Sequence, residues 1–225
     1  RGTLPPKMSE VFPNDFVDSR RNLIPWFNGQ IYRYQVIEGR LPKVDYSKLR
    51  ENKPINLFEC AKILGRQLIS RQFRLQLTFY DKVAAFKKNL YAIYNLKPEF
   101  HYYYILSILN SRFYSYVQVG VNASGQRDDY PSFSLKDYRD FLIPQLSISE
   151  QQPFIDLVDN ILNLTSSIDY SNDKVKQAQV NEYEHQIDQM VYELYGLTPE
   201  EIAVVEGGRW TSLVLTATRS RYQEP

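Results

Sequence analysis

Lysine and arginine side chains recur along residues 62–88, where they could neutralise a polyanion. Cationic side chains bind phosphate groups by charge and by their N–H donors. A solvated sheet face has a similar composition, so no single residue is decisive, but the cluster together favours phosphate binding. The candidate phosphate contacts are Arg33, Lys62, Arg66, Arg71, Arg74, Lys82, Lys87 and Lys88.

A polar segment between residues 120 and 131 has the residue types that read base edges. Glutamine can pair with adenine and arginine with guanine through two hydrogen bonds, and glycine permits a close approach. A plain surface turn is the alternative. Tyr32 could stack on a base, whereas we expect Trp26 in the core. The candidate base-reading residues are Ser124, Gly125, Gln126, Arg127 and Tyr130.

The residues that catalysis usually needs are scarce. The two histidines and the single cysteine, Cys60, show no metal-ligand spacing, and no glycine-rich phosphate loop is present. A Glu-x-Lys at residues 51–53 occurs in some nucleases, but no Pro-Asp precedes it at a plausible distance, so we expect a solvated turn. We expect Cys60 to be a small core residue and both histidines to lie at the surface. The sequence therefore predicts no catalytic residue, no metal and no cofactor in this chain.

Composition describes a globular protein with unevenly distributed charge. The 225 residues are 43% hydrophobic and 24% charged, and no apolar run reaches the roughly 18 residues of a membrane span. One cysteine indicates a reducing compartment, so we expect a cytoplasmic protein without a membrane partner. The absence of an initiator methionine suggests an excised fragment. Residues 1–100 contain 18 Lys and Arg against 9 Asp and Glu, whereas residues 101–225 contain 9 against 17. Only the first half should attract a polyanion.

The first hundred residues are typical of short strands and turns. Residues 31–36 predict a helical turn that leads into a strand. Alternating or apolar runs predict strands over residues 23–27, 61–64, 67–70, 74–79 and 90–94. Such close spacing favours a largely antiparallel sheet.

Helical periodicity begins at Pro98. Tyr102, Ile105, Leu109, Phe113 and Tyr116 recur on one face, which we interpret as core. A short helix is expected near residues 134–141.

Two longer helices follow as an antiparallel hairpin, the first with a capping box of Ser149 and Gln152. They are separated by residues 171–173, and Gly196 ends the second. Thr198-Pro199 starts a last helix. The expected fold class is α+β: a twisted, mainly antiparallel sheet with packed helices, followed by a C-terminal helical hairpin.

The order of several short motifs resembles that of a known module, the TaqI-like C-terminal specificity domain. This domain is the target-recognition part of type IIG restriction–modification enzymes and adenine-N6 DNA methyltransferases, and it is similar to type I specificity subunits. The resemblance covers roughly residues 20–207, but Asn28 and Gln30 depart from the family pattern. The motifs that carry the resemblance are P-W-F-N-G-Q-I-Y-R-Y at 25–34, K-I-L at 62–64, Y-I-L-S-I-L-N-S at 104–111, F-L-I-P at 141–144, E-Q-Q-P-F-I at 150–155 and V-Y-E-L-Y-G-L-T at 191–198.

The resemblance implies roles for the segments and for the partners. Residues 1–20 would be a loose lead-in, 21–147 a DNA target-recognition domain, 148–207 a helical brace or spacer, and 208–225 a tail. The partners would be duplex DNA and the methyltransferase domain of the same parent chain. S-adenosylmethionine and Mg²⁺ would belong to parent domains outside this chain, which would not itself be an enzyme.

Three alternatives stay open at this level. The chain could be a protein–protein interaction module that uses the helical hairpin, or a separate specificity subunit of a type I-like system. A stand-alone hydrolase is disfavoured because the catalytic groups are missing.

Overall fold

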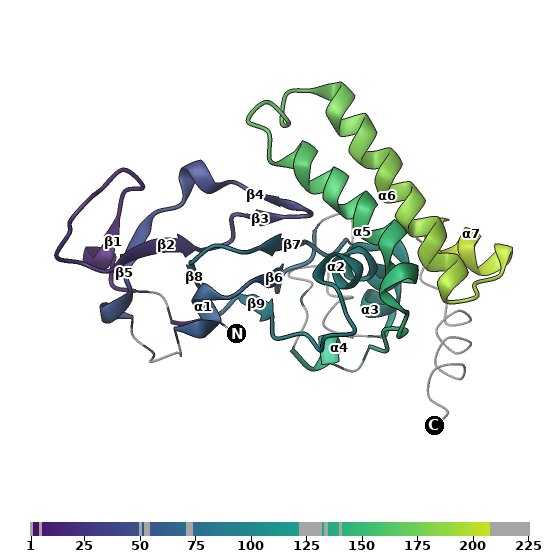
Figure 1. Ribbon diagram of the computed structural model, residues 1–225, viewed down its shortest axis with the longest axis horizontal. Helices are drawn as coiled ribbons and strands as arrows, with labels where there is room; N and C mark the ends of the chain where they lie inside the picture. Colours follow the sequence, from purple (N-terminus) through teal and green to yellow (C-terminus); the bar gives the residue numbers. More distant parts are fainter. Residues whose placement is uncertain are drawn as a thin grey trace. The chain divides into compact units, whose positions relative to one another are not determined.

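The structure, a computed structural model, describes residues 2–4, 6–49, 51, 55–70, 74–121, 132, 135–139 and 141–207. Arg71, the segment from Ser124 to Tyr130 and the tail at 208–225 lie outside this part of the chain. The chain forms two compact units. The first unit comprises 1–67 and 76–96, and the second comprises 68–75 and 97–225. The first holds the strands and the second the long helices (Figure 1), so the expected α+β class is confirmed.

A four-stranded sheet forms one part of the first unit. Its order is β1 (Val11–Phe12), β5 (Lys43–Asp45), β2 (Leu23–Phe27) and β8 (Ala85–Phe86). The β2–β8 pair is parallel and the other pairs are antiparallel. Phe27, Val44 and Phe86 are completely buried, and Trp26 is 3% exposed, which confirms its predicted place in the core.

A three-stranded antiparallel sheet forms the other part. Its order is β7 (Leu77–Tyr80), β6 (Lys62–Arg66) and β9 (Leu90–Ile93), with Gly65 opposite Leu77 and Arg66 opposite Leu90. Ile63 and Leu64 of the central strand are fully buried. These strands confirm the elements expected near 61–64, 74–79 and 90–94.

The strand expected at 67–70 is wrong. Ser70 N donates to Arg74 O at 3.1 Å, and Arg74 N donates to Ser70 Oγ at 3.0 Å. Both partners lie within the second unit. The only β pairing described within 67–70 is an isolated antiparallel bridge between Leu68 and Ser132, so no named strand forms there.

A small hairpin replaces the helical turn expected at 31–36. β3 (Ile31–Tyr32) and β4 (Gln35–Val36) pair antiparallel across a two-residue turn. Tyr34 adopts φ 57°, which is uncommon for a non-glycine residue. Its side chain is 2% exposed and its N–H donates to Leu77 O at 2.9 Å, so burial and a tertiary hydrogen bond stabilise the turn.

Short helical turns complete the first unit. They are η1 (Met8–Glu10), η2 (Glu38–Arg40), η3 (Tyr46–Lys48) and α1 (Asn56–Glu59).

The second unit is built on α2 (Tyr102–Asn110) and α3 (Arg112–Val121), with α4 (Leu135–Arg139) nearby in sequence. The expected continuous helix breaks at Ser111, whose ψ is 157° and whose Oγ accepts from Tyr114 N at 3.0 Å. Four of the five residues of the predicted apolar face are core, since Ile105, Leu109, Phe113 and Tyr116 are at most 5% exposed, whereas Tyr102 is half-buried.

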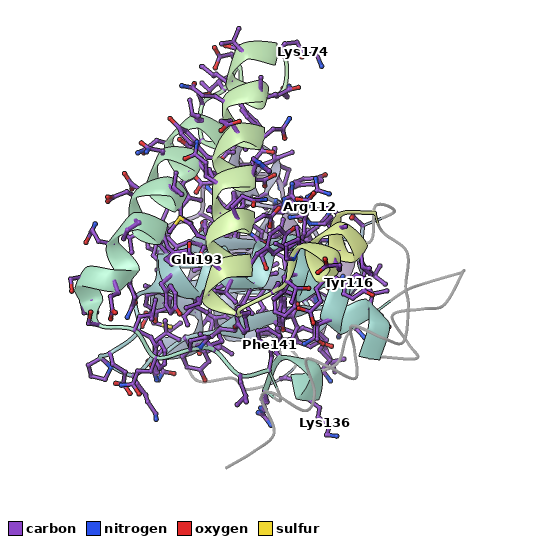
Figure 2. The ribbon with its side chains drawn as sticks, turned by 90° about the vertical axis from the view of Figure 1, so that its right-hand side faces the viewer. Arg112, Tyr116, Lys136, Phe141, Lys174 and Glu193 are labelled. Carbon is purple, nitrogen blue, oxygen red and sulfur yellow. The ribbon has the colours of Figure 1, made fainter. Side chains whose placement is uncertain are left out.

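A helical hairpin packs against α2 and α3 within the second unit. α5 (Ile148–Thr165) and α6 (Lys174–Leu194) lie side by side, and α7 (Pro199–Gly207) follows (Figures 1 and 2). The predicted caps at Gly196, with φ 62°, and at Thr198, whose Oγ1 accepts from Glu201 N at 3.3 Å, are confirmed.

The capping box expected at Ser149 and Gln152 is wrong. The box consists of Ser147 and Glu150, so the helix starts two residues earlier. Gln151 in the first turn is fully buried, and its Nε2 donates to Glu99 O and Leu146 O. Across the described residues, no helix is both long and apolar enough to cross a membrane.

Candidate nucleic-acid interface

Three segments of the first unit bring cations to one end of the β7-β6-β9 sheet. Arg66 is the last residue of β6 and lies opposite Leu90, so the turn with Lys87 and Lys88 is adjacent to it. Arg33 lies in the β3–β4 turn, which is attached to the start of β7 by the hydrogen bond from Tyr34 N to Leu77 O. We call Arg33, Arg66, Lys87 and Lys88 the basic end.

Arg66 is half-buried and its guanidinium group is held by one neutral side chain. Nη1 donates to Gln76 Oε1 at 2.9 Å, and the backbone N–H of Arg66 donates to Gln76 O at 3.1 Å. A neutral amide orients the guanidinium without cancelling its charge. Arg66 is therefore oriented at the end of the central strand by a neutral partner and by no carboxylate among the described residues.

The two lysines of the adjacent turn differ in their surroundings. Lys88 forms an ion pair with Glu51, in which the side chains are 41% and 24% exposed. For Lys87, no acidic partner occurs among the residues that the structure describes. Backbone hydrogen bonds hold the turn: Lys87 N donates to Phe27 O and Lys88 N to Thr3 O, both at 3.0 Å. Lys87 thus presents an unneutralised charge from an ordered backbone.

Lys82 lies at the opposite end of the same sheet. It follows Tyr80, which pairs with Lys62 at the start of β6, about 13 Å along the strand from Arg66. Its Nζ pairs with both carboxylate oxygens of Glu38 at 2.9 and 3.0 Å. The charge of Lys82 is therefore locally compensated and separate from the basic end.

Lys62 does not face solvent, contrary to what a phosphate contact requires. It is 0% exposed, and its Nζ donates to the carbonyl oxygens of Phe58, Cys60 and Lys82. Burial lowers the pKa of its ammonium group. Lys62 is buried together with Ile63 and Leu64 of the same strand, so we leave it out of the proposed contacts.

Arg74 belongs to the second unit and has a structural partner. Its Nη2 donates to the carbonyl oxygen of Asn110, the last residue of α2, at 2.7 Å. A helix C-terminus exposes unpaired carbonyl groups, which a cation stabilises. We therefore leave Arg74 out of the proposed contacts. Arg71 and the base-reading candidates lie outside the described residues.

Sequence reasoning missed two side chains that contact these cations, Gln76 and Glu51. Gln76 alternates with Leu75 and Leu77, and this pattern indicates a polar side chain beside Arg66 once the strand register is known. Glu51 carries no such signal, because its contact with Lys88 joins residues 37 positions apart.

The two units differ in net charge, and the positively charged one is the unit that contains the basic end. By sequence, the first unit contains 15 Lys and Arg against 8 Asp and Glu, and the second contains 12 against 18. Phosphate groups are attracted by the first and repelled by the second.

Metal-binding groups do not gather in the described ranges: no three His, Cys, Asp or Glu side chains there could hold a metal ion. Cys60, expected in the core, is half-buried instead. His101 and His185 are exposed, as predicted, and His101 Nδ1 accepts from Tyr103 N at the start of α2.

Comparison with known proteins shows a family and a protein to which this chain is similar. The family model of the TaqI-like C-terminal specificity domain matches residues 24–142. The chain is 32% identical over 194 residues to a protein of Methanocaldococcus jannaschii, "Putative type II restriction enzyme and methyltransferase RM.MjaORFECS2P". This match covers 83% of the chain but only 16% of that relative's length.

A solved structure shares the fold. The type IIL restriction–modification enzyme MmeI, in complex with DNA, superimposes with a TM-score of 0.64 at 12% identity, over 98% of this chain and 35% of that chain. The family match spans more than half of the 225 residues. The chain belongs to the family of TaqI-like C-terminal specificity domains, which are specificity domains of restriction–modification enzymes.

Proposed function

We propose that this chain recognises a specific duplex DNA sequence and targets a methyltransferase and endonuclease to it. The observation that carries the proposal is the basic end, where Arg66 and Lys87 present charges that no described carboxylate neutralises. Family membership supports the same role, and MmeI was solved in complex with DNA.

In this proposal the basic end contacts the phosphate backbone. Arg66 and Lys87 supply the principal contacts, with Arg33 beside them and Lys88 partly compensated by Glu51. Phosphate contacts set affinity and register, but they do not discriminate between bases. Sequence discrimination is assigned to Gln126 and Arg127, which remain predictions from residue type.

The helical hairpin is proposed as a brace against the methyltransferase domain of the parent protein. Residues 148–207 contain 12 Asp and Glu against 2 Lys and Arg, a balance that disfavours phosphate. Asp188 attaches the hairpin to α3, because its Oδ1 accepts from Arg112 N at 2.7 Å. Figure 2 shows Lys174 at the end of α6 remote from Arg112. Near this end Ile168 is fully exposed.

The catalytic chemistry is assigned to other parts of the parent, which we propose is a type IIG enzyme. S-adenosylmethionine and Mg²⁺ would bind there. The chain itself carries no methyltransferase N-P-P-Y signature.

Salt-dependent binding of a duplex of arbitrary sequence tests the proposal. The slope of log affinity against log salt falls by about 0.9 for each lost phosphate contact. We expect the double variant Arg66→Ala/Lys87→Ala of the 225-residue chain to flatten the slope by about two such steps. Lys82→Ala, at the opposite end of the sheet, is the control and should leave the slope unchanged. Binding that is absent, or indifferent to salt and to both variants, would contradict the proposal and favour the protein–protein module.

A further inference from the structure

The turn with Lys87 and Lys88 is held by residues more than eighty positions earlier in the chain. Thr3 N donates to Phe86 O at 2.8 Å, Lys88 N donates to Thr3 O at 3.0 Å, and Gly2 N donates to Leu90 O at 3.3 Å. Thr3 forms a parallel bridge with Lys87. We call residues 2–4 the N-terminal strap. It satisfies backbone groups on both sides of the basic turn.

Gly2 is the residue that permits this close approach. A Cβ atom at this position would overlap the carbonyl oxygen of Phe86 and lie 2.6 Å from that of Lys87. Both neighbours are backbone atoms, which cannot rotate away as a flexible side chain can. Thr3, next to it, is 0% exposed. The strap is therefore packed into the first unit, unlike the loose lead-in expected over residues 1–20.

The strap lies 20 or more residues before the family match, which begins at residue 24. The opposite side of the turn is held within the matched part, where Gln67 N donates to Asn89 O at 2.9 Å. Without the strap, Lys88 N and Phe86 O lose their partners. The lysines keep their charge but lose a defined position relative to Arg66.

We propose that the N-terminal strap positions Lys87 and Lys88 for phosphate contact and that Gly2 is its positioning residue. This inference rests on the proposed function, because it concerns how the basic end meets DNA. It places a support of the proposed recognition surface outside the residues that match the family model.

The test is Gly2→Val in the 225-residue chain, with Gly39→Val as the matched control. A Cβ atom at Gly39 meets nothing within 4 Å, so the control adds the same side chain without a clash. We expect Gly2→Val to weaken duplex binding about fivefold to tenfold at 0.1 M salt, the effect of losing about one phosphate contact. Thr3→Pro, which removes the N–H that Phe86 O accepts, is the second variant and should act alike. The control should bind as the unmodified chain does.

A double-mutant cycle separates positioning from a general structural effect. In a Lys87→Ala/Lys88→Ala background, we expect Gly2→Val to have almost no further effect, because its targets are gone. An undiminished effect in that background, or unmodified binding by Gly2→Val and Thr3→Pro, would overturn the inference and leave the proposed function intact. No duplex binding by the unmodified chain would overturn the proposed function and the inference with it. Amide exchange at Lys88 would then still show whether the strap holds the turn.

Discussion

Arg66 Nη1 and Gln76 Oε1 lie 2.9 Å apart, and this hydrogen bond joins the end of β6 to the residue that precedes β7. The guanidinium group of Arg66 is thereby oriented while it keeps its charge. Substitution of Arg66 removes a charge, whereas substitution of Gln76 changes only the position of that charge. The two residues therefore allow the number of charges and their placement to be tested separately.

Gln76→Leu tests placement alone. We expect duplex affinity to fall about twofold to fivefold, with the salt slope unchanged, because the charge of Arg66 remains. Fluorescence anisotropy across a salt series measures both quantities. Gln145→Leu, at an exposed position of the second unit, is the control. A slope that flattens as it does in Arg66→Ala would contradict the orienting role.

Glu51→Gln tests whether the ion pair with Glu51 keeps the ammonium group of Lys88 from contacting phosphate. Removal of the carboxylate should free the ammonium group for phosphate and steepen the salt slope by up to about 0.9. Glu38→Gln changes net charge equally but frees Lys82 at the opposite end of the sheet. We expect only Glu51→Gln to steepen the slope. Equal responses would indicate a general charge effect in place of a localised interface.

Lys62→Met tests the structural assignment of the buried lysine. Methionine has a side chain of similar length and shape, but it has no N–H groups to donate to the carbonyl oxygens of Phe58, Cys60 and Lys82. We expect the free energy of unfolding to fall by about 1–3 kcal/mol, the cost of leaving buried acceptors unpaired. Urea denaturation measures this change. The structural role would be contradicted if Lys62→Met were as stable as the unmodified chain and flattened the salt slope of DNA binding. Lys62 would then be counted among the phosphate contacts.

Acid pH should weaken the start of α5. The side-chain and backbone hydrogen bonds that Ser147 donates hold the pKa of Glu150 below its ordinary 4.5. A carboxyl whose pKa is lowered on folding stabilises the fold fully above the unfolded value, and this contribution is lost as the pH falls through the folded value. We expect the stability difference between the unmodified chain and Glu150→Gln to shrink below pH 4.5. Urea titrations from pH 7 to pH 3 check this, and a difference independent of pH would contradict it.

Local chemistry made much of the secondary structure predictable. The apolar face at Ile105, Leu109 and Phe113 identified a packed helix, because helical spacing places these residues on one side. The caps at Gly196 and Thr198 were equally visible, since capping depends on neighbouring residues. The start of α5 was predicted two residues late, because two possible capping boxes overlap in the sequence, Ser147 with Glu150 and Ser149 with Gln152, and the helix uses the first.

The fold class, the family resemblance and the concentration of positive charge in the first half could all be read from the sequence, because composition, periodicity and motif order are properties of the chain alone. Which of the cations can reach a phosphate group depends on the folded structure. The tertiary fold buries Lys62, pairs Lys82 with Glu38 and leaves Lys87 unneutralised among the described residues. These outcomes depend on contacts between residues distant in sequence, and a lysine in a sequence looks the same whether its ammonium group meets water, a carboxylate or three backbone carbonyls.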